Sequence, residues 1–238
     1  MRRGAARPRL VLLEGLVRFG ELDGEKGQEA AVLLAESSGG SGERIHLAVV
    51  GRWRDEVVSL STFPVGDRPK IRSFALAGRE IVLEVVEAGP GEPMCCPTQL
   101  ATKVYAFVEG VLRPLRSEVT GKLSLALLAG GEWEVAAIDG EPLPADVRPP
   151  TVLFESGRIA GFAGCNRFTG TIEETAPGEL AIGPLALTRM ACPGPVMEVE
   201  SRFAASLAAA TRWGYVAGRV VLSGMAGETP RAVTLVRD

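Results

Sequence analysis

The sequence predicts a mostly β protein, of the β-rich α+β class, that is divided into two domains. Short apolar or alternating segments bounded by Gly, Pro, Ser and Asp recur along the chain, which is typical of antiparallel strands joined by turns. Only residues 195–210 carry apolar side chains at helical spacing over several turns. With 238 residues the chain is long enough for two domains of ordinary size.

The first domain is predicted to span residues 11–118, after a basic tail of residues 1–10 that carries no pattern. Its expected strands are residues 11–19, 30–34, 45–50, 57–60, 71–76, 79–86, 103–108 and 111–115, and a helix around residues 55–61 is an alternative for one of them. The steps Ala77-Gly78 and Glu109-Gly110 predict tight hairpins. Residues 117–124 are predicted to be the linker.

The second domain is predicted to span residues 119–238. Alternation at Trp133 and Val135 predicts its first strand, and further strands are expected at residues 152–154, 158–163, 171–173, 179–182, 186–189, 216–222 and 232–236. Large aromatic side chains supply the expected core: Trp133, Phe154, Phe162, Phe168 and Phe203.

The predicted helix, residues 195–210, begins with a proline in its first turn, where no backbone donor is lost. Glu198 and Glu200 lie near the positive end of the helix dipole. One face is apolar and is expected to pack on the sheet, and it consists of Val196, Val199, Phe203, Leu207 and Ala210.

Composition excludes several classes of protein. A net charge of −3 offers no clustered basic surface for nucleic acid. No apolar run approaches the ~20 residues of a membrane-spanning helix. The N-terminal segment is too short and too charged for an export signal, so the chain is expected to be either cytosolic or an exported protein without its signal.

Catalytic patterns are absent from the sequence. It contains no G-x-S-x-G or P-loop motif, and His46 is the single histidine, so we expect no enzyme and no cofactor. His46 lies in a strand-like segment without ligand spacing, which favours a structural role. Arg189 is a candidate for binding or for an ion pair with Glu198 or Glu200.

The second half resembles the META (HslJ-like) domain family over roughly residues 123–238. The matching residues are Trp133, Pro142, Phe154, the G-x-x-G-C-N-x-F-x-G signature from Gly161 to Gly170, the segment from Leu180 to Cys192, Met197, Glu198, Glu200, Phe203 and Leu207. The resemblance implies a small antiparallel β-barrel-like fold with one helix and a role in stress tolerance.

The first half is similar to the N-terminal region of some bacterial envelope lipoproteins. The similar segments are FGELDG, AVLL, LAVV and the loop motif P-M-C-C-P-T. This similarity implies an extracytoplasmic protein, whether periplasmic, at the cell surface or secreted. A lipid anchor, absent from this chain, would be its only link to a membrane.

Four cysteines with no metal-binding spacing favour disulfides, which form outside the cytoplasm. Cys165 and Cys192 are candidates for one bridge, and two buried thiols are the alternative. Cys95 and Cys96 are adjacent. The sequence leaves three alternatives open for this pair. The two cysteines form a strained vicinal disulfide that acts as a redox switch, each cysteine pairs with a different partner, or both are simply buried.

Two further groups of residues are candidates for binding. Asp23 and Glu25 lie in an acidic turn that favours either calcium or a solvated hairpin. Asn166 and Arg167 are candidate binding residues, although asparagine also suits a tight turn. We therefore expect a non-catalytic envelope protein that binds an unknown protein or small ligand. The alternatives are a thiol-based redox-responsive protein using Cys95 and Cys96, and a calcium-stabilised module.

Overall fold

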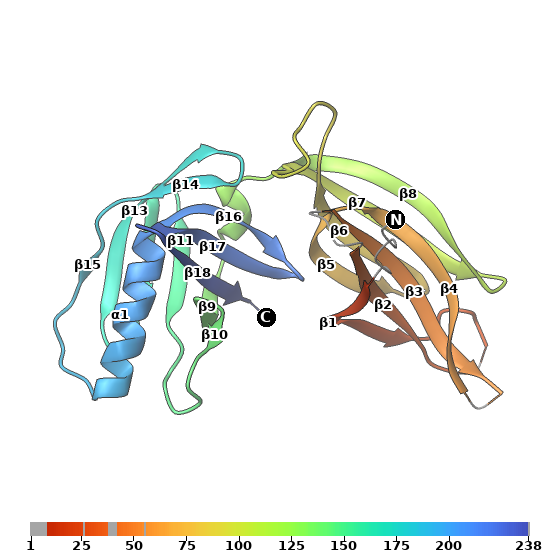
Figure 1. The fold of residues 1–238 in the computed structure, drawn as a ribbon, viewed down its shortest axis with the longest axis horizontal. Coiled ribbons are helices and arrows are strands. Elements are labelled where there is room, and N and C mark those ends of the chain that lie inside the picture. The colour runs from red at the N-terminus through yellow and green to blue at the C-terminus, as the bar shows by residue number, and fades with distance from the viewer. Residues whose placement is uncertain (1–8, 26, 38–41, 55, 238) are drawn as a thin grey trace, which may run out of the picture. The chain divides into compact units, whose positions relative to one another are not determined.

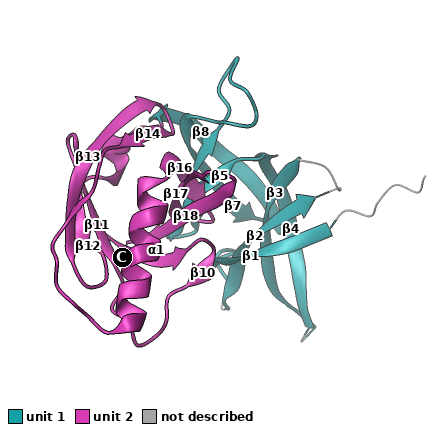
Figure 2. Ribbon diagram, turned by 60° about the vertical axis from the view of Figure 1, so that its left-hand side comes forward, with its two compact units in different colours: residues 1–122 teal, residues 123–238 magenta. Residues whose placement is uncertain are grey.

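A computed structural model describes residues 9–25, 27–37, 42–54 and 56–237. The chain divides into two compact units, residues 1–122 and residues 123–238 (Figure 2). The predicted basic tail lies largely outside the described residues. The predicted linker at residues 117–124 is wrong in its first part, because strand β8 (Val111–Lys122) runs through it. This strand exposes nearly every side chain, so it lacks the apolar run by which a strand is recognised.

The first unit contains two four-stranded antiparallel sheets, each with its strands in sequence order (Figure 1). One sheet consists of β1 (Arg9–Gly20), β2 (Glu29–Ser37), β3 (Glu43–Trp53) and β4 (Glu56–Asp67). The other consists of β5 (Lys70–Ala77), β6 (Glu80–Glu87), β7 (Gln99–Val108) and β8. Strand β1 packs against β5, and β4 against β8. Strand β4 occupies residues 56–67, so the helix considered around residues 55–61 is wrong over its described part.

Two hairpin turns show how local chemistry sets the register. Glu109 and Gly110 both have positive φ, 53° and 77°, which is the conformation of the predicted tight turn between β7 and β8. The turn between β5 and β6 lies one residue later than predicted, at Gly78 and Arg79, because Ala77 pairs with Glu80. Glycine thereby takes the first turn position, where φ is 61° and a side chain would be strained.

The second unit is a closed antiparallel barrel of eight strands, in the order β9-β11-β12-β13-β14-β16-β17-β18, with β18 returning to pair with β9. These strands are β9 (Glu132–Ile138), β11 (Thr151–Glu155), β12 (Arg158–Phe162), β13 (Arg167–Ala176), β14 (Glu179–Ile182), β16 (Ala210–Val216), β17 (Arg219–Ala226) and β18 (Thr229–Val236). Two short strands, β10 (Glu141–Pro142) and β15 (Ala186–Leu187), add to β9 and β13, and a 3-10 turn (Leu125–Leu128) precedes β9. The predicted mostly β fold with a barrel-like second domain is confirmed.

Helix α1 (Gly194–Ala208) packs against β9, β17 and β18. It ends two residues before the predicted limit because Ala210 begins strand β16. Here the chain passes so close to β17 that any side chain at Gly224 would collide with the carbonyl of Ala209. Phe203 is fully buried and meets Phe168 of β13 edge-to-face, with ring centres 5.5 Å apart.

Four of the five predicted core aromatics are buried, namely Trp133, Phe154, Phe168 and Phe203. The prediction for Phe162 is wrong, because Ile159 and Gly161 take the inward positions of β12 and Phe162 is only half-buried. Its ring instead lies beneath the guanidinium of Arg148, 4.7 Å from Cζ. Among the described helices, none combines the length and the apolar character that crossing a membrane requires.

Candidate binding site

A disulfide between Cys165 and Cys192 joins the turn before β13 to the segment that leads into α1. The Cα atoms of the two cysteines are 6.0 Å apart. The predicted bridge is therefore present, and the alternative of two thiols is wrong. Its effect is to fasten the segment that leads into α1 to the start of β13.

Glu200, a buried residue of α1, also connects the helix to the turn before β13. Its side chain is 6% exposed, and its carboxylate accepts hydrogen bonds from the backbone N–H groups of Cys165 (3.2 Å) and Asn166 (2.6 Å). The Asn166 side-chain amide donates a third, 2.9 Å long. A buried carboxylate with three donors is satisfied without a cation, and Arg189, the partner considered from the sequence, is exposed.

The amide oxygen of Asn166 is engaged as well. It accepts hydrogen bonds from the Thr188 hydroxyl (2.8 Å) and from the backbone N–H of Met190 (2.7 Å). Asn166 thus ties three segments of the second unit together, and its side chain is used within the fold. Of the predicted binding residues, Arg167 and Arg189 have exposed side chains.

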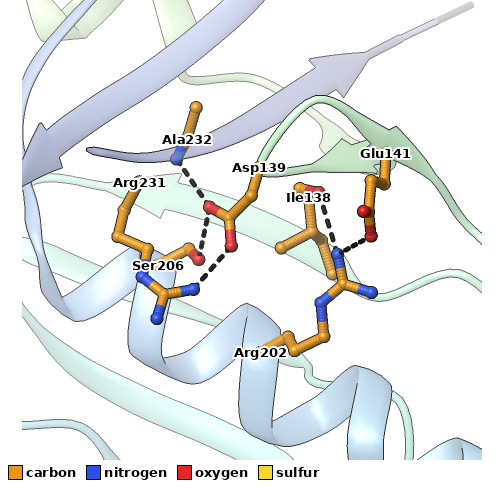
Figure 3. A network of polar contacts seen from close by, with 7 residues as sticks. All are labelled: Ile138, Asp139, Glu141, Arg202, Ser206, Arg231 and Ala232. Atoms are coloured by element: carbon orange, nitrogen blue, oxygen red, sulfur yellow. Dashed lines mark hydrogen bonds and ion pairs between the residues drawn. The ribbon is translucent and has the colours of Figure 1, made fainter. Parts of the chain in front are cut away.

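A second polar cluster lies around Asp139, in the turn after β9 (Figure 3). One carboxylate oxygen accepts hydrogen bonds from the Ser206 hydroxyl and the Ala232 N–H, each 2.9 Å, and the other accepts one from Arg231 at 2.7 Å. Burial acts to raise the pKa of Asp139, but hydrogen bonds from Ala232, Arg231 and Ser206 outweigh it, so the pKa lies below its ordinary value.

The Asp139 cluster links β9, α1 and β18, and it was not identified from the sequence. The adjacent Arg202 extends it by donating to the Ile138 carbonyl (3.2 Å) and to Glu141 (2.6 Å). The one local signal is the Asp139-Gly140 pair, a common turn sequence, with Asp139 at φ 55°. Every carboxylate oxygen of Asp139 faces a donor of the fold, which gives the cluster a structural role.

The outer face of β9, β11, β12, β13 and β15 contains a hollow that could hold a ligand. Strand register places five side chains in one row across these strands: Glu132, Leu153, Ala160, Thr169 and Ala186. A neighbouring row contains Glu134, Thr151, Phe162 and Arg167. Paired residues of adjacent strands point to the same side of a sheet, and so do residues two apart on one strand. Both rows therefore lie on the same face as Phe162, which is the outer face of the barrel.

Small side chains in the first row leave a hollow between longer ones. Its lining includes Leu153, Ala160 and Ala186 of the first row, together with Glu132, Arg158, Arg167 and Thr169. The hollow has a volume of about 480 Å³, within the usual range for ligand sites. We call this surface the outer groove.

Charge is distributed unevenly along the outer groove. Arg158 and Arg167 flank the β12–β13 side, where Arg158 Nε donates to the Thr169 hydroxyl at 3.2 Å. Glu155 lies 3.6 Å from the Arg158 guanidinium, so this cation is oriented but remains 59% exposed. Glu132 lies at the opposite end and accepts a hydrogen bond from Thr151 (2.7 Å). The arginines offer donors for a carboxylate next to an apolar floor.

A second hollow, of about 520 Å³, meets the outer groove at Glu132. Its lining includes Gly130, Gly131, Trp133 and Arg237. The Arg237 guanidinium lies 4.4 Å from the centre of the Trp133 ring, and the indole N–H donates to the Leu128 carbonyl at 2.7 Å. The two hollows together extend the concave surface beyond β9.

In the first unit, the predicted acidic turn does not gather its carboxylates. The carboxylate of Asp23 accepts the backbone N–H of Glu25 (2.8 Å), and Glu21 forms an ion pair with Arg79 (3.2 Å). Glu29 is buried and accepts the N–H of Leu22 at 2.8 Å. Among the described residues, no three His, Cys, Asp or Glu side chains are grouped so that they could hold a metal ion.

His46 and the adjacent cysteines take different places in the first unit. His46 lies 2.7 Å from Glu36 on the neighbouring strand. The structure does not join Cys95 and Cys96 by the predicted vicinal disulfide, although their sulfur atoms lie 2.7 Å apart in the loop between β6 and β7. Cys95 is exposed and Cys96 is half-buried, so the alternative that both are buried is wrong. Glu92 anchors this loop by accepting hydrogen bonds from Gly89 N–H (3.1 Å) and from the Thr98 hydroxyl (2.6 Å).

The second unit is thus a closed β-barrel with one helix, fastened by a disulfide and a buried glutamate. Residues 126–236 match the META domain family, and the unit is a META domain, as the residue pattern of the second half predicted. A curated relative is the heat shock protein HslJ of Escherichia coli strain K12, which is 36% identical over 59 residues. That match covers 25% of this chain and 41% of the length of HslJ.

Two solved structures are also similar to the chain. An NMR structure of a protein from Burkholderia xenovorans shares 25% identity with a TM-score of 0.39, covering 48% of this chain and 86% of that one. A second NMR structure shares 24% identity with a TM-score of 0.38, covering 47% of this chain and 94% of that one. The similarity of the first half to envelope lipoproteins remains a prediction.

Proposed function

We propose that the chain is a non-catalytic binding protein whose META unit takes an extended, carboxylate-bearing segment of a partner protein along the outer groove. The observation that carries this proposal is the row of Ala160, Thr169 and Ala186, small side chains with Arg158 and Arg167 beside them. An extended peptide fits a shallow surface that crosses several strands. A single guanidinium group recognises a carboxylate with two parallel hydrogen bonds.

Arrangement of the polar clusters also supports a binding role over catalysis. Asp139 and Glu200, the polar residues best placed for chemistry in the META unit, have their carboxylate oxygens directed at donors of the fold itself. Neither carboxylate faces the outer groove. A group that is satisfied within the fold stabilises it and is not poised to transfer a proton.

The cellular role proposed here is stress tolerance in the cell envelope. The Escherichia coli relative is a heat shock protein, which supports the stress role. The Cys165–Cys192 disulfide supports an extracytoplasmic location, because such bridges persist in oxidising compartments. The similarity of the P-M-C-C-P-T loop to envelope lipoproteins points the same way.

A titration with a labelled short polyglutamate peptide, followed by fluorescence anisotropy, tests the groove. We expect the full chain to bind and Arg167→Glu to weaken binding by about tenfold or more, the effect of losing a charge-assisted hydrogen bond. Arg219→Glu, an exposed change on β17 outside the groove, is the matched control and leaves binding unchanged. Equal binding by both variants would contradict the proposal. Competition by free glutamate as strong as by unlabelled peptide would instead indicate a small-molecule site.

A further inference from the structure

The loop between β6 and β7 holds two adjacent sulfur atoms in a defined position. Cys96 N–H donates to the Pro93 carbonyl at 3.1 Å, so residues 93–96 form a tight turn. This turn brings the sulfur atoms of Cys95 and Cys96 to 2.7 Å from each other. Cys95 is exposed, whereas Cys96 is partly covered. A reagent in solution therefore meets Cys95 first.

Glu92 makes the loop rigid by receiving donors from both of its ends. Its carboxylate accepts hydrogen bonds from the N–H of Gly89 (3.1 Å), the N–H of Thr98 (3.0 Å) and the Thr98 hydroxyl (2.6 Å). Lys122 of β8 adds an ion pair at 3.3 Å. With Pro93 at the first position of the turn and Pro97 directly after it, the cysteines cannot easily move apart. Holding two sulfurs together favours a reaction between them over reaction with a further molecule.

One cation of the first unit interacts electrostatically with the exposed cysteine. Arg68, in the turn between β4 and β5, interacts electrostatically with Cys95. Arg68 is itself held by Asp67, through hydrogen bonds of 3.0 and 3.2 Å, and by donating its backbone N–H to Glu43 at 2.7 Å. A neighbouring cation stabilises the thiolate, which is the form of cysteine that attacks disulfides.

We propose that Cys95 and Cys96 form a redox-active pair that exchanges with disulfides. The Cys95 thiolate attacks one sulfur of a disulfide R–S–S–R, forms a mixed disulfide and releases one thiolate. The Cys96 thiolate then attacks the Cys95 sulfur, expels the second thiolate and leaves a Cys95–Cys96 disulfide. Two protein thiols and one disulfide thus become one protein disulfide and two R–SH, the thiol protons passing to the released thiolates.

The chemistry of adjacent cysteines makes this exchange reversible. Closing a ring between neighbouring residues distorts the peptide unit between them, and a strained disulfide is readily reduced. The pair thereby differs from Cys165–Cys192, whose Cys165 is buried at 3% exposure in the META unit. The proposal concerns the first unit and does not depend on the outer groove.

Oxidised glutathione is the probe, applied to the full chain after mild reduction and followed by intact mass and peptide mapping. We expect the wild-type chain to lose two hydrogens and to keep no glutathione. Cys96→Ser removes the resolving thiol, so glutathione remains attached at Cys95. Arg68→Gln slows the first step by roughly two- to fivefold, as loss of an exposed charge pair would.

Two results would overturn the proposal. One is a wild-type chain that retains glutathione on Cys95 or forms dimers, since resolution by Cys96 would then have failed. The other is a chain whose two thiols survive excess oxidised glutathione. An intact Cys165–Cys192 bridge, together with an unchanged melting temperature, verifies that each variant is folded.

Discussion

Glu200 and Asn166 form a buried pair in which one carboxylate serves two donors of the same residue. The backbone N–H of Asn166 lies 2.6 Å and its side-chain amide 2.9 Å from the Glu200 carboxylate. The pair connects α1 to the segment between β12 and β13, beside the Cys165–Cys192 disulfide. The outer groove depends on this junction, because Arg167 follows Asn166 directly.

Glu200→Ala is predicted to destabilise the META unit by about 3 kcal/mol, because it leaves buried N–H groups without acceptors. The measurement is the free energy of unfolding in urea, followed by tryptophan fluorescence. Glu198→Ala, an exposed change on the same helix, is the matched control and should lie within about 0.5 kcal/mol of wild type. A Glu200→Ala chain as stable as this control would show that the pair contributes nothing.

Replacing both Cys165 and Cys192 by alanine is predicted to lower stability by about 3.5 kcal/mol in the chain-entropy model, given their separation of 27 residues. Calorimetry of the full chain measures it as a lower melting temperature for the META unit alone. Cys95→Ala with Cys96→Ala serves as the control pair. If the melting temperature of the META unit is the same in both double variants, the bridge does not stabilise the fold.

Asp139→Ala is predicted to cost about 2–3 kcal/mol, since Ser206, Arg231 and the N–H of Ala232 lose their shared acceptor. Urea unfolding again provides the measurement. Asp146→Ala removes an exposed carboxylate from the same unit and is expected to have little effect. Equal stability of the two variants would contradict the structural role of the Asp139 cluster.

The loop that carries Cys95 and Cys96 is predicted to lose order in acid. Hydrogen bonds from the Thr98 hydroxyl, and then from the Thr98 and Gly89 N–H groups, lower the pKa of Glu92 from 4.5 to about 2. Because the folded pKa is lowered, the stabilisation is fully present above pH 4.5 and is lost as the pH falls from 4.5 towards 2.

Amide hydrogen exchange at Gly89 and Thr98, corrected for its intrinsic pH dependence, measures this effect. Protection is expected to fall across that interval in the wild-type chain. Glu92→Gln keeps the shape of the side chain but not its charge, so its protection should be lower throughout and independent of pH. Wild-type protection that is constant between pH 4.5 and 2 would contradict the prediction.

The alternation of apolar and polar side chains identified most strands, but it failed where a strand is exposed on both faces. Strand β8 buries only Leu112, so its second half was predicted to be a linker. Phe162 was assigned to the core by residue type alone, although Gly161 occupies the inward position. Local patterns report burial on one face, and they contain no information where neither face is buried.

The polar clusters could not be predicted because their partners are far apart in sequence. Asp139 meets Ser206 and Arg231, 67 and 92 residues later, and only the closed barrel brings them together. The Cys165–Cys192 bridge was foreseeable, because cysteine count and a hairpin pattern restrict its partners. The outer groove depends on the register of five strands. Arg167 was a candidate from the sequence, whereas the position of Arg158 beside the outer groove follows only from the pairing of β12 with β13.

The central claim is that the META unit binds a carboxylate-bearing segment in the outer groove. Amide shift mapping by NMR, on the isotope-labelled full chain titrated with a short polyglutamate peptide, tests it most directly. Amide shifts are expected to change at Ala160, Thr169 and Ala186, and in Arg167→Glu these changes should need about tenfold more peptide or beyond to reach the same size. Binding of the peptide in the outer groove would be contradicted if the amide signals of these three residues did not shift, or if they shifted equally in Arg167→Glu.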